Sequence, residues 1–536
     1  MFIVVRFIGV HCRSLPFVGV RFTTARTAAS SNTVSNLILT SKEVQELEKR
    51  AFAEGVGQED LMDLAGFGIG RKIAQLEPVP GICVVYLGKG NNAGDAIVAA
   101  SVLERSGWSI SARLVSSPED LDSLPKTKWN ALAANFRRTT SVSTGWSDIR
   151  PIILLDGLLG LGARPGLSDR YRQFAAELNG IRSDWNARTY AVDIPTGLSD
   201  SAVDPHSVIA DVTLTVGFPK SCLFLDEATN IVGNISVIDL PALTERAPAG
   251  QGRSQLTVPN ALYDLVKRRP FDSHKGAFGR VGIIAGSRGL IGAGALASKA
   301  ALKAGAGLIT LYATEDIYSI VATKAETEVM VKPVAYIREA LSDRLDAIAI
   351  GPGLGRGRAE EVIQIVREFA NPMVVDADAL NIISEHPETL SRLAGPRLLT
   401  PHPGEMSRLF STNNMSRAEI VERFTNEYPV TLLLKGARTL VAQRGYSLSY
   451  NSTGTPGMAT GGSGDLLTGV CGALLGRGIA PYDAARLGAW LCGRAAELTL
   501  RDESEESMIP SDTLRHLGKA FEEIRQARGC KPESKF

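Results

Sequence analysis

The stretch ICVVYLGKGNNAGDAIVAA, residues 82–100, joins an apolar run to a candidate helix through a turn rich in glycine and asparagine. A short apolar run that ends in turn residues is typical of a buried strand. A strand that leads directly into a helix is the unit from which parallel sheets are built. This stretch therefore predicts an α/β fold.

The same alternation of strand and helix patterns continues through most of the chain, in two sets. The expected strands include residues 81–88, 151–157 and 189–195 in the first set and 280–287, 345–353, 372–378, 397–405 and 430–437 in the second. Between the sets, residues 241–256 are polar and rich in proline, glycine and alanine, as linkers are. We expect one domain over 41–245 and a second over 255–528.

Composition excludes several classes of function. The 536 residues carry 58 basic and 57 acidic side chains, so the charge does not indicate a nucleic-acid partner. No apolar run approaches the roughly 20 residues of a membrane-spanning helix, so we expect no membrane partner. The six cysteines are scattered without a CxxC pair, which favours reduced thiols and a cytoplasmic protein. The six histidines form no HExxH motif that would indicate zinc or iron.

The first forty residues contain no acidic side chain, while Arg6, Arg13, Arg21 and Arg26 lie among serine, threonine and alanine. This pattern is similar to that of a mitochondrial transit peptide. An extension without a role, or a start codon assigned too far upstream, explains it equally well. The expected location is therefore cytoplasmic, or mitochondrial if residues 1–40 direct import.

Polar clusters follow three expected strands of the first domain. They begin at Gly88, Asp156 and Asp193. Ligands of open parallel sheets bind outside the carboxyl ends of the strands. Glycines there let backbone N–H groups approach an anion, and the following helix adds its positive end. The three clusters together favour a binding site, although glycine, asparagine and aspartate also dominate ordinary turns.

The side chains of these clusters have distinct chemical uses. Asn91 and Asn92 offer amide donors and carbonyl acceptors. Asp156 and Thr196 add oxygens, so an oxygen-lined cation site is expected. Asp193 is a candidate for proton transfer.

In order and spacing, the motifs GKGNNAGD, DGLLGLG and VDIPTG resemble the NAD(P)H-hydrate epimerase domain of the bifunctional NAD(P)H-hydrate repair enzymes. The resemblance implies a Rossmann-like three-layer domain and a potassium ion (K+) beside the substrate. The ligands of potassium would be Asn92, Asp156 and Thr196. The residues in contact with the hydrated nucleotide would be Asn91, Asn92, Ala93, Gly94, Asp95, Gly160, Leu161, Gly162, Ala163, Arg164 and the catalytic Asp193.

Some residues depart from this family's pattern. Ala93 and Ala96 stand where the family usually has glycine, Leu161 interrupts its FGTG motif, and Thr196 replaces a serine. A methyl group at a position of positive φ would be costly. An N-terminal half that only binds or oligomerises is therefore a further hypothesis.

The most informative stretch of the second domain is residues 451–478. Within it, Gly461–Asp465 opens a helix whose apolar residues recur at helical spacing. Successive N–H groups at this helix start form an anion hole. Asp465 beside it suits the removal of a proton from a hydroxyl that attacks a phosphate. An aspartate that only stabilises the first turn of the helix, through the helix dipole, would show the same pattern.

Motifs around this stretch resemble the ADP-dependent NAD(P)H-hydrate dehydratase of the same repair enzymes, a ribokinase-like α/β domain. They occupy residues 274–287, 292–312, 351–355, 374–381, 400–405 and 432–441. The resemblance implies Mg2+ and ADP or ATP as cofactors. The residues on the hydrated nucleotide would be Ala293, Gly353, Gly355, His402 and the catalytic Asp465. Those on the adenine nucleotide would be Lys435, Gly436, Ala437, Arg438, Thr439, Gly461, Gly462, Ser463 and Gly464.

The resemblances together imply a homo-oligomeric enzyme of nicotinamide nucleotide repair. Its first domain would interconvert the R and S forms of hydrated NADH and NADPH. Its second would dehydrate the S form at the expense of ADP or ATP. The alternative is a ribokinase-like small-molecule kinase with a non-catalytic N-terminal binding domain.

Overall fold

The computed structural model describes residues 36–138, 151–162, 166–250 and 252–527. Most of the expected targeting segment, residues 1–35, lies outside this part of the chain. Of the segment's last residues, Leu39 is buried and Thr40 caps the first helix, where its hydroxyl accepts from the amide of Glu43.

The first sheet has seven strands in the order β3-β2-β1-β4-β5-β8-β9, and all neighbouring pairs are parallel. Its strands are β1 Ile82–Leu87, β2 Ser109–Leu114, β3 Arg137–Arg138, β4 Ile152–Gly157, β5 Arg188–Val192, β8 Val212–Val216 and β9 Asn234–Ile238. A separate two-stranded hairpin consists of β6 Leu198–Ser199 and β7 Ala202–Val203. The helices of this lobe are α1 Ser41–Ala53, α2 Gln58–Leu76, α3 Asn91–Arg105, α4 Ser123–Leu132, α5 Asp169–Trp185, α6 Thr229–Val232 and α7 Pro241–Thr244.

The second sheet has ten strands in the order β10-β19-β18-β17-β16-β15-β14-β11-β12-β13. They are β10 Gln255–Leu256, β11 Arg280–Ile284, β12 Leu308–Thr314, β13 Met330–Val334, β14 Ala347–Ile350, β15 Met373–Val375, β16 Arg397–Leu399, β17 Thr431–Leu434, β18 Thr439–Gln443 and β19 Ser449–Asn451. The pairs β17–β18 and β18–β19 are antiparallel, and the other pairs are parallel.

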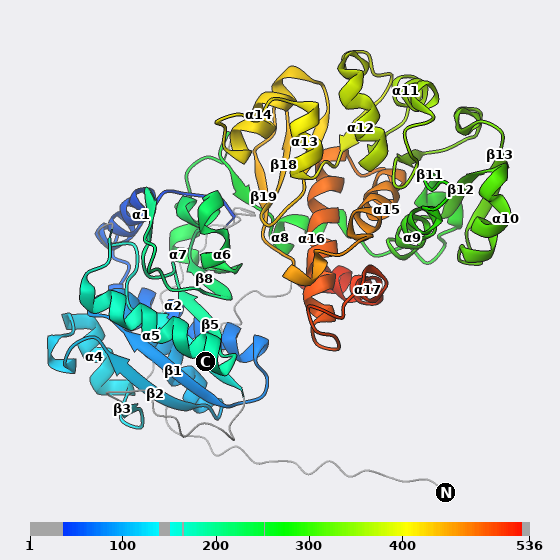
Figure 1. The fold of residues 1–536 in the computed structure, drawn as a ribbon. Coiled ribbons are helices and arrows are strands. Elements are labelled where there is room, and N and C mark those ends of the chain that lie inside the picture. Colours follow the sequence, from blue (N-terminus) through cyan, green and yellow to red (C-terminus); the bar gives the residue numbers. More distant parts are fainter. Residues whose placement is uncertain (1–35, 139–150, 163–165, 251, 528–536) are drawn as a thin grey trace, which may run out of the picture. The chain divides into compact units, whose positions relative to one another are not determined.

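Helices lie on both sides of this sheet (Figure 1). They are α8 Pro259–Leu262, α9 Ile291–Lys303, α10 Glu315–Lys324, α11 Ala359–Glu368, α12 Ala377–Glu385, α13 Pro403–Leu409, α14 Arg417–Glu427, α15 Ser463–Gly476, α16 Pro481–Thr499 and α17 Pro510–Gln526. No helix in the described part of the chain is both long and apolar enough to cross a lipid bilayer.

The central strands of both sheets are buried on both faces, which explains why they are largely apolar runs. Val85 of β1 packs into one hydrophobic cluster, whereas the next residue, Tyr86, packs into another. In the second sheet, Ala349 and Ile350 of β14 divide in the same way. Successive strand residues point to opposite faces, so each lobe has three layers. This confirms the predicted α/β class.

The sheet register brings the polar clusters of the first lobe to one edge. β1 and β4 are parallel neighbours with Tyr86 opposite Asp156 and Leu87 opposite Gly157. β5 lies on the other side of β4 and leads into Asp193. All three strands therefore present their carboxyl ends, and the turns that follow them, to the same edge of the sheet.

Candidate active sites

Asp156 is the organising side chain of the first site. It lies at the end of β4 and is fully buried. Its Oδ1 accepts from the hydroxyl of Thr196 at 2.7 Å and from the amide of Leu158 at 3.2 Å, and its Oδ2 accepts from the amide of Thr196 at 2.8 Å. These bonds tie the turn after β4 to the turn after β5.

Asn92 joins the same pair of turns from the start of α3. Its side-chain amide donates to the carbonyl of Leu159 at 3.0 Å, and a β-carbon added at Gly160 would lie 3.0 Å from its Oδ1. The amide of Leu159 donates to the hydroxyl of Thr196 at 3.1 Å. These hydrogen bonds link Asn92, Asp156 and Thr196 through the turn at Leu159.

The chemistry of these donors fits a hard cation. The amide oxygen of Asn92, the carboxylate of Asp156 and the hydroxyl of Thr196 are all oxygens, which hard cations prefer. Burial raises the pKa of Asp156 to about 6, because the charged carboxylate has lost its water shell. A cation among these oxygens would offset that loss.

Asp193 is held by a lysine that the sequence reading did not select. Lys220 follows β8, and its side chain is 1% exposed. Its ammonium group donates to Oδ1 of Asp193, to the carbonyl of Val216 at 2.6 Å and to the hydroxyl of Thr215 at 3.3 Å. The amide of Val216 also donates to Oδ1 of Asp193 at 3.0 Å. Every described hydrogen bond to the carboxylate therefore falls on Oδ1, which leaves Oδ2 available to a ligand.

The carboxyl groups of Asp95 and Glu48 lie close enough to this ion pair for its charges to influence their pKa values. Burial, followed by the charges of Asp193 and Glu48, holds the pKa of Asp95 well above its usual range. Burial and the charge of Asp193 also raise the pKa of Glu48. Protonated carboxyl groups can donate hydrogen bonds as well as accept them. The first site thus combines the ion pair of Asp193 and Lys220 with two neighbouring carboxyl groups whose pKa values are raised.

The helix α3 begins within the GKGNNAGD motif and orients its expected contacts. Asn91 is its first residue and is exposed, whereas Gly94 packs so tightly against Met62 that an added β-carbon would lie 2.4 Å from the sulfur. The anticipated strain at Ala93 and Ala96 is absent, because both residues are helical, buried and without positive φ.

The second half of the expected substrate loop is described only in part. Gly160, Leu161 and Gly162 form the turn after Leu159, and the carbonyl of Leu161 accepts from the side chain of Gln45 at 3.1 Å. Ala163 and Arg164 lie outside the described residues.

The second site centres on Asp376, at the end of β15. Its Oδ1 accepts from the ammonium group of Lys435 at 2.7 Å, and its Oδ2 accepts from the hydroxyl of Thr468 at 2.6 Å. Lys435 also lies 3.7 Å from a carboxylate oxygen of Glu405. Burial alone would lower the pKa of Lys435, but the charges of Asp376 and Glu405 raise it. A fixed cation therefore lies between two buried carboxylates.

The start of α15 adds an anion hole and a base to this group. Among the described residues, the N–H groups of Gly464 and Asp465 have no acceptor. A β-carbon added at Gly464 would lie 3.5 Å from the ammonium nitrogen of Lys435. Burial and the charge of Asp376 raise the pKa of Asp465, whereas Lys435 opposes that shift. The carboxylate of Asp465 makes no hydrogen bond with a described residue, so it is available to a ligand.

His402 caps the N-terminus of α13, and its proton position follows from its partners. Its Nδ1 accepts from the amides of Gly404 at 3.0 Å and Glu405 at 3.4 Å. Nδ1 is therefore unprotonated, and the neutral ring carries its proton on Nε2. That nitrogen lies 3.5 Å from Glu405. About half of the His402 side chain is exposed, so it can reach a ligand.

The remaining expected residues divide between backbone and side-chain roles. A β-carbon added at Gly353 would lie 3.0 Å from that of Ala293, so these two positions are adjacent. Arg438 is buried, and its guanidinium donates to the carbonyl of Gly233. The hydroxyl of Thr439 donates to the carbonyl of Gly436 at 2.9 Å. Gly436, Ala437, Arg438 and Thr439 can therefore meet a nucleotide mainly through their backbone.

The glycine-rich residues at the start of α15 can also meet the nucleotide mainly through their backbone. Gly462 has a φ of +96°, which permits the turn into the helix, and the hydroxyl of Ser463 donates to the carbonyl of Met458 at 2.8 Å. Gly461 is exposed.

Thr468 was not predicted as a site residue. It lies within the predicted helix, where a buried threonine looks like any other core residue.

Comparisons with known proteins agree with this division into two sites. A model of the NAD(P)H-hydrate dehydratase family matches residues 281–519, and a model of the YjeF-related protein N-terminus matches residues 58–222. The bifunctional NAD(P)H-hydrate repair enzyme Nnr of Moorella thermoacetica is 33% identical over 520 residues, which cover 90% of this chain and 96% of that protein. The enzyme of the same name from Escherichia coli is 32% identical over 445 residues, covering 81% and 84%.

Among solved structures, similarity extends to an ADP/ATP-dependent NAD(P)H-hydrate dehydratase from Bacillus subtilis that was co-crystallised with ATP and Mg2+. It is 26% identical, with a TM-score of 0.45, and the match covers 50% of this chain and 98% of that one.

Proposed function

The chain belongs to the bifunctional NAD(P)H-hydrate repair enzymes, and on that premise we propose that its two sites act in sequence on hydrated NADH and NADPH. The first site interconverts the R and S forms. The second dehydrates the S form at the expense of ADP or ATP. The observation that carries the proposal is that the carboxylate of Asp465 and the amides that open α15 have no hydrogen-bond partner within the described ranges of the chain.

In the first site, we assign proton transfer to Asp193. Inversion of the carbon that bears the added hydroxyl requires a bond at that carbon to break and re-form. One proton must reach the departing atom, and one must leave the atom that returns. Lys220 fixes Oδ1 of Asp193 through a buried ion pair, so Oδ2 can perform both transfers. Asn91, Asp95 and the turn at Gly160–Gly162 are proposed to bind the nucleotide.

A potassium ion held by Asn92, Asp156 and Thr196 would supply fixed positive charge for the substrate's anionic groups. The protein's own part is to hold these oxygens at the strand edge through the hydrogen bonds between the two turns. The amides at the start of α3 are then oriented toward the nucleotide phosphates.

In the second site, we assign base catalysis to Asp465. It removes the proton from the substrate hydroxyl as that oxygen attacks the terminal phosphoryl group of ADP or ATP. The amides of Gly464 and Asp465 stabilise the charge on the transferring group. The C–O bond then breaks and phosphate leaves with the oxygen, while the neighbouring ring carbon loses a proton, and the electrons of that C–H bond form the double bond that restores the dihydronicotinamide ring. Ala293, Gly353, Gly355 and His402 are proposed to hold that ring.

Magnesium would neutralise the phosphates of the nucleotide. No group of three or more histidine, cysteine or acidic side chains with the geometry of a metal site occurs among the described residues. Mg2+ is usually held by substrate phosphates, waters and one or two carboxylates, so Glu405 suffices as the protein donor. Asp376 is already bonded to Lys435 and Thr468.

Two matched substitutions test the assignment. Asp193→Asn should leave dehydration of S hydrate intact and abolish R-to-S conversion. Asp465→Asn should do the reverse. Chiral separation of the hydrates measures the first activity, and ADP-dependent recovery of NADH measures the second. A phosphorylated product that accumulates without NADH would instead favour a small-molecule kinase, and unchanged R-to-S conversion in Asp193→Asn would remove that residue from the mechanism.

We also propose that the chain forms a homo-oligomer. The support is an apolar pair on α2, Leu64 and Phe67, whose side chains lie one helical turn apart and are 53% and 38% exposed. Light scattering on the purified protein measures the mass. A monomer at micromolar concentration would contradict this proposal.

A further inference from the structure

A cavity lies at the carboxyl ends of three neighbouring strands in the second lobe. Ser287 follows β11, Thr314 ends β12, and Gly355 follows β14, and all three line the cavity. Its volume is about 290 Å³. Ligand pockets usually measure about 300–1,000 Å³, so this cavity suits part of a dinucleotide rather than the whole molecule.

A glycine-rich loop joins this cavity to the second site. Gly351 packs against Asp376 so closely that an added β-carbon would lie 1.9 Å from the carbonyl oxygen of Asp376. Gly353 lies beside Ala293, and the amide of Gly355 donates to Asp378 at 2.8 Å. The loop therefore leads from the carboxylates of the second site to the cavity. A ligand that starts at Asp465 and follows the loop ends there.

Two arginines border the cavity, and only one is committed to a protein partner. Arg358 lies 3.1 Å from a carboxylate oxygen of Glu361. The side chain of Arg288 is exposed and makes no hydrogen bond or ion pair with any residue in the described part of the chain. Arginine presents a planar fork of donors that matches phosphate. Arg288 is therefore a free cation of the type that binds phosphate oxygens.

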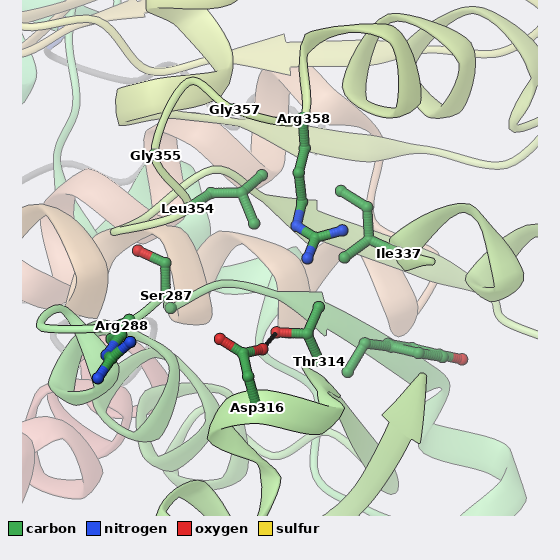
Figure 2. Close-up of a pocket in the computed structure, with 11 residues that line it drawn as sticks. Ser287, Arg288, Thr314, Asp316, Ile337, Leu354, Gly355, Gly357 and Arg358 are labelled. Atoms are coloured by element: carbon green, nitrogen blue, oxygen red, sulfur yellow. Dashed lines mark hydrogen bonds between the residues drawn. The ribbon is translucent and has the colours of Figure 1, made fainter. Parts of the chain in front are cut away.

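The opposite side of the cavity carries an oriented carboxylate. The hydroxyl of Thr314 donates to Oδ1 of Asp316 at 2.6 Å, which fixes the group. Figure 2 shows Asp316 and Thr314 facing Arg358 across the cavity. An acidic side chain after the second strand of a βαβ unit suits hydrogen bonds to the hydroxyls of a nucleotide ribose. β11, α9 and β12 form such a unit here.

We propose that this cavity binds the adenylate half of the hydrated dinucleotide, with Arg288 on the phosphates and Asp316 on the hydroxyls of the adenosine ribose. The inference rests on the proposed dehydratase function. A 2′-phosphate on that ribose would meet the charge of Asp316. The dehydratase site should therefore favour hydrated NADH over hydrated NADPH.

Three variants of the full chain test the proposal. Arg288→Ala removes the phosphate contact, and Asp316→Asn removes the charge without changing the shape of the side chain. Arg356→Ala is the matched control, because it removes an exposed arginine of the neighbouring glycine-rich loop that does not line the cavity. Each variant is assayed for dehydration of both S hydrates at saturating ADP. Fluorescence titration with NADH and NADPH measures binding without turnover.

Hydrogen bonds to charged groups contribute about 1.5–3 kcal/mol, so Arg288→Ala should raise KM and the Kd of NADH about tenfold or more. Asp316→Asn should raise the ratio of kcat/KM for NADPH hydrate over NADH hydrate about tenfold. Arg356→Ala should change neither value. Unchanged KM and Kd in Arg288→Ala, or an effect confined to the KM of ADP, would overturn the proposal. An inactive wild type that still binds NADH through Arg288 would instead contradict the dehydratase function alone.

Discussion

At the first site, the critical contact is the one between Lys220 and Asp193. The ammonium group of Lys220 is buried and gives all three of its donors to protein acceptors, one of which is Asp193. Asp193 itself has a φ of +66°, a conformation that favours glycine and small polar residues. The surrounding bonds must hold it there, so this residue is positioned at a local energetic cost.

Replacing Lys220 by methionine should slow R-to-S conversion about 100-fold, the usual scale of one positioned proton-transfer group. Dehydration of S hydrate by the same protein should be unchanged and serves as the internal control for folding of the second lobe. Lys220→Arg should recover part of the activity because it keeps the charge. Equal rates in the methionine variant and wild type would exclude this role. Circular dichroism distinguishes lost positioning from an unfolded first lobe.

The dehydration rate should depend on pH through Asp465. Burial and the charge of Asp376 raise its pKa, and the base must be deprotonated to act, so activity falls as pH drops through this raised value. Lys435→Met removes the cation that opposes the shift. The acidic limb of kcat at saturating ADP should therefore move to higher pH. A limb that stays in place or moves to lower pH would contradict the assignment of Asp465 as the base.

The sequence predicts some of the site residues and misses others. Asp193 and Asp465 stand out because Asp193 directly follows β5 and Asp465 lies in the first turn of α15, each within a motif of polar and glycine residues. Lys220 does not, because it lies in the segment after β8 and reaches Asp193 only through the fold. The concern over Ala93 was wrong for a related reason. The helix begins two residues before it, which a single sequence does not reveal.

Among the elements, α15 carries the anion hole and depends on close packing against α9. A β-carbon added at Gly469 would lie 2.1 Å from the carbonyl oxygen of Ala297. Gly469→Ala should therefore destabilise the second lobe by about 1–3 kcal/mol, the usual cost of overpacking. Gly518→Ala on α17 is the control, because nothing lies within 4 Å of its added β-carbon.

The control should be neutral or stabilising by up to about 1 kcal/mol, since alanine is the better helix former. Thermal unfolding of the full chain measures both variants. A melting temperature for Gly469→Ala equal to that of Gly518→Ala would show that α15 and α9 do not pack as described.

Elements that are buried on both faces were predicted well. β1 and β14 are apolar throughout, β4 and β17 are apolar apart from the end of β4 and the start of β17, and turn residues follow each of them. The antiparallel strands β18 and β19 were not separated from their surroundings, because they are short and mix polar with apolar residues. Sequence periodicity cannot assign strand direction, which depends on pairing between distant segments.

For the molecule as a whole, the two sites serve one substrate in order. The first makes either hydrate available as the S form, and the second consumes only that form. The residues that build each site follow separate strands. Because these strands are parallel, their carboxyl ends lie at the same edge of the sheet. The sequence could predict that convergence from the α/β pattern alone. It could not predict that the glycine-rich loop after β14 links the second site to the cavity at Arg288.

The most direct test of this account follows the absorbance of the dihydronicotinamide ring when the purified full chain meets separated R and S NADH hydrate. The assay is run with and without ADP and magnesium, against a control for spontaneous epimerisation. We predict complete, ADP-dependent recovery of NADH from both forms, with recovery from R faster than the uncatalysed conversion. Recovery from S alone would contradict a functional first site, and no recovery from either form would contradict the repair function itself.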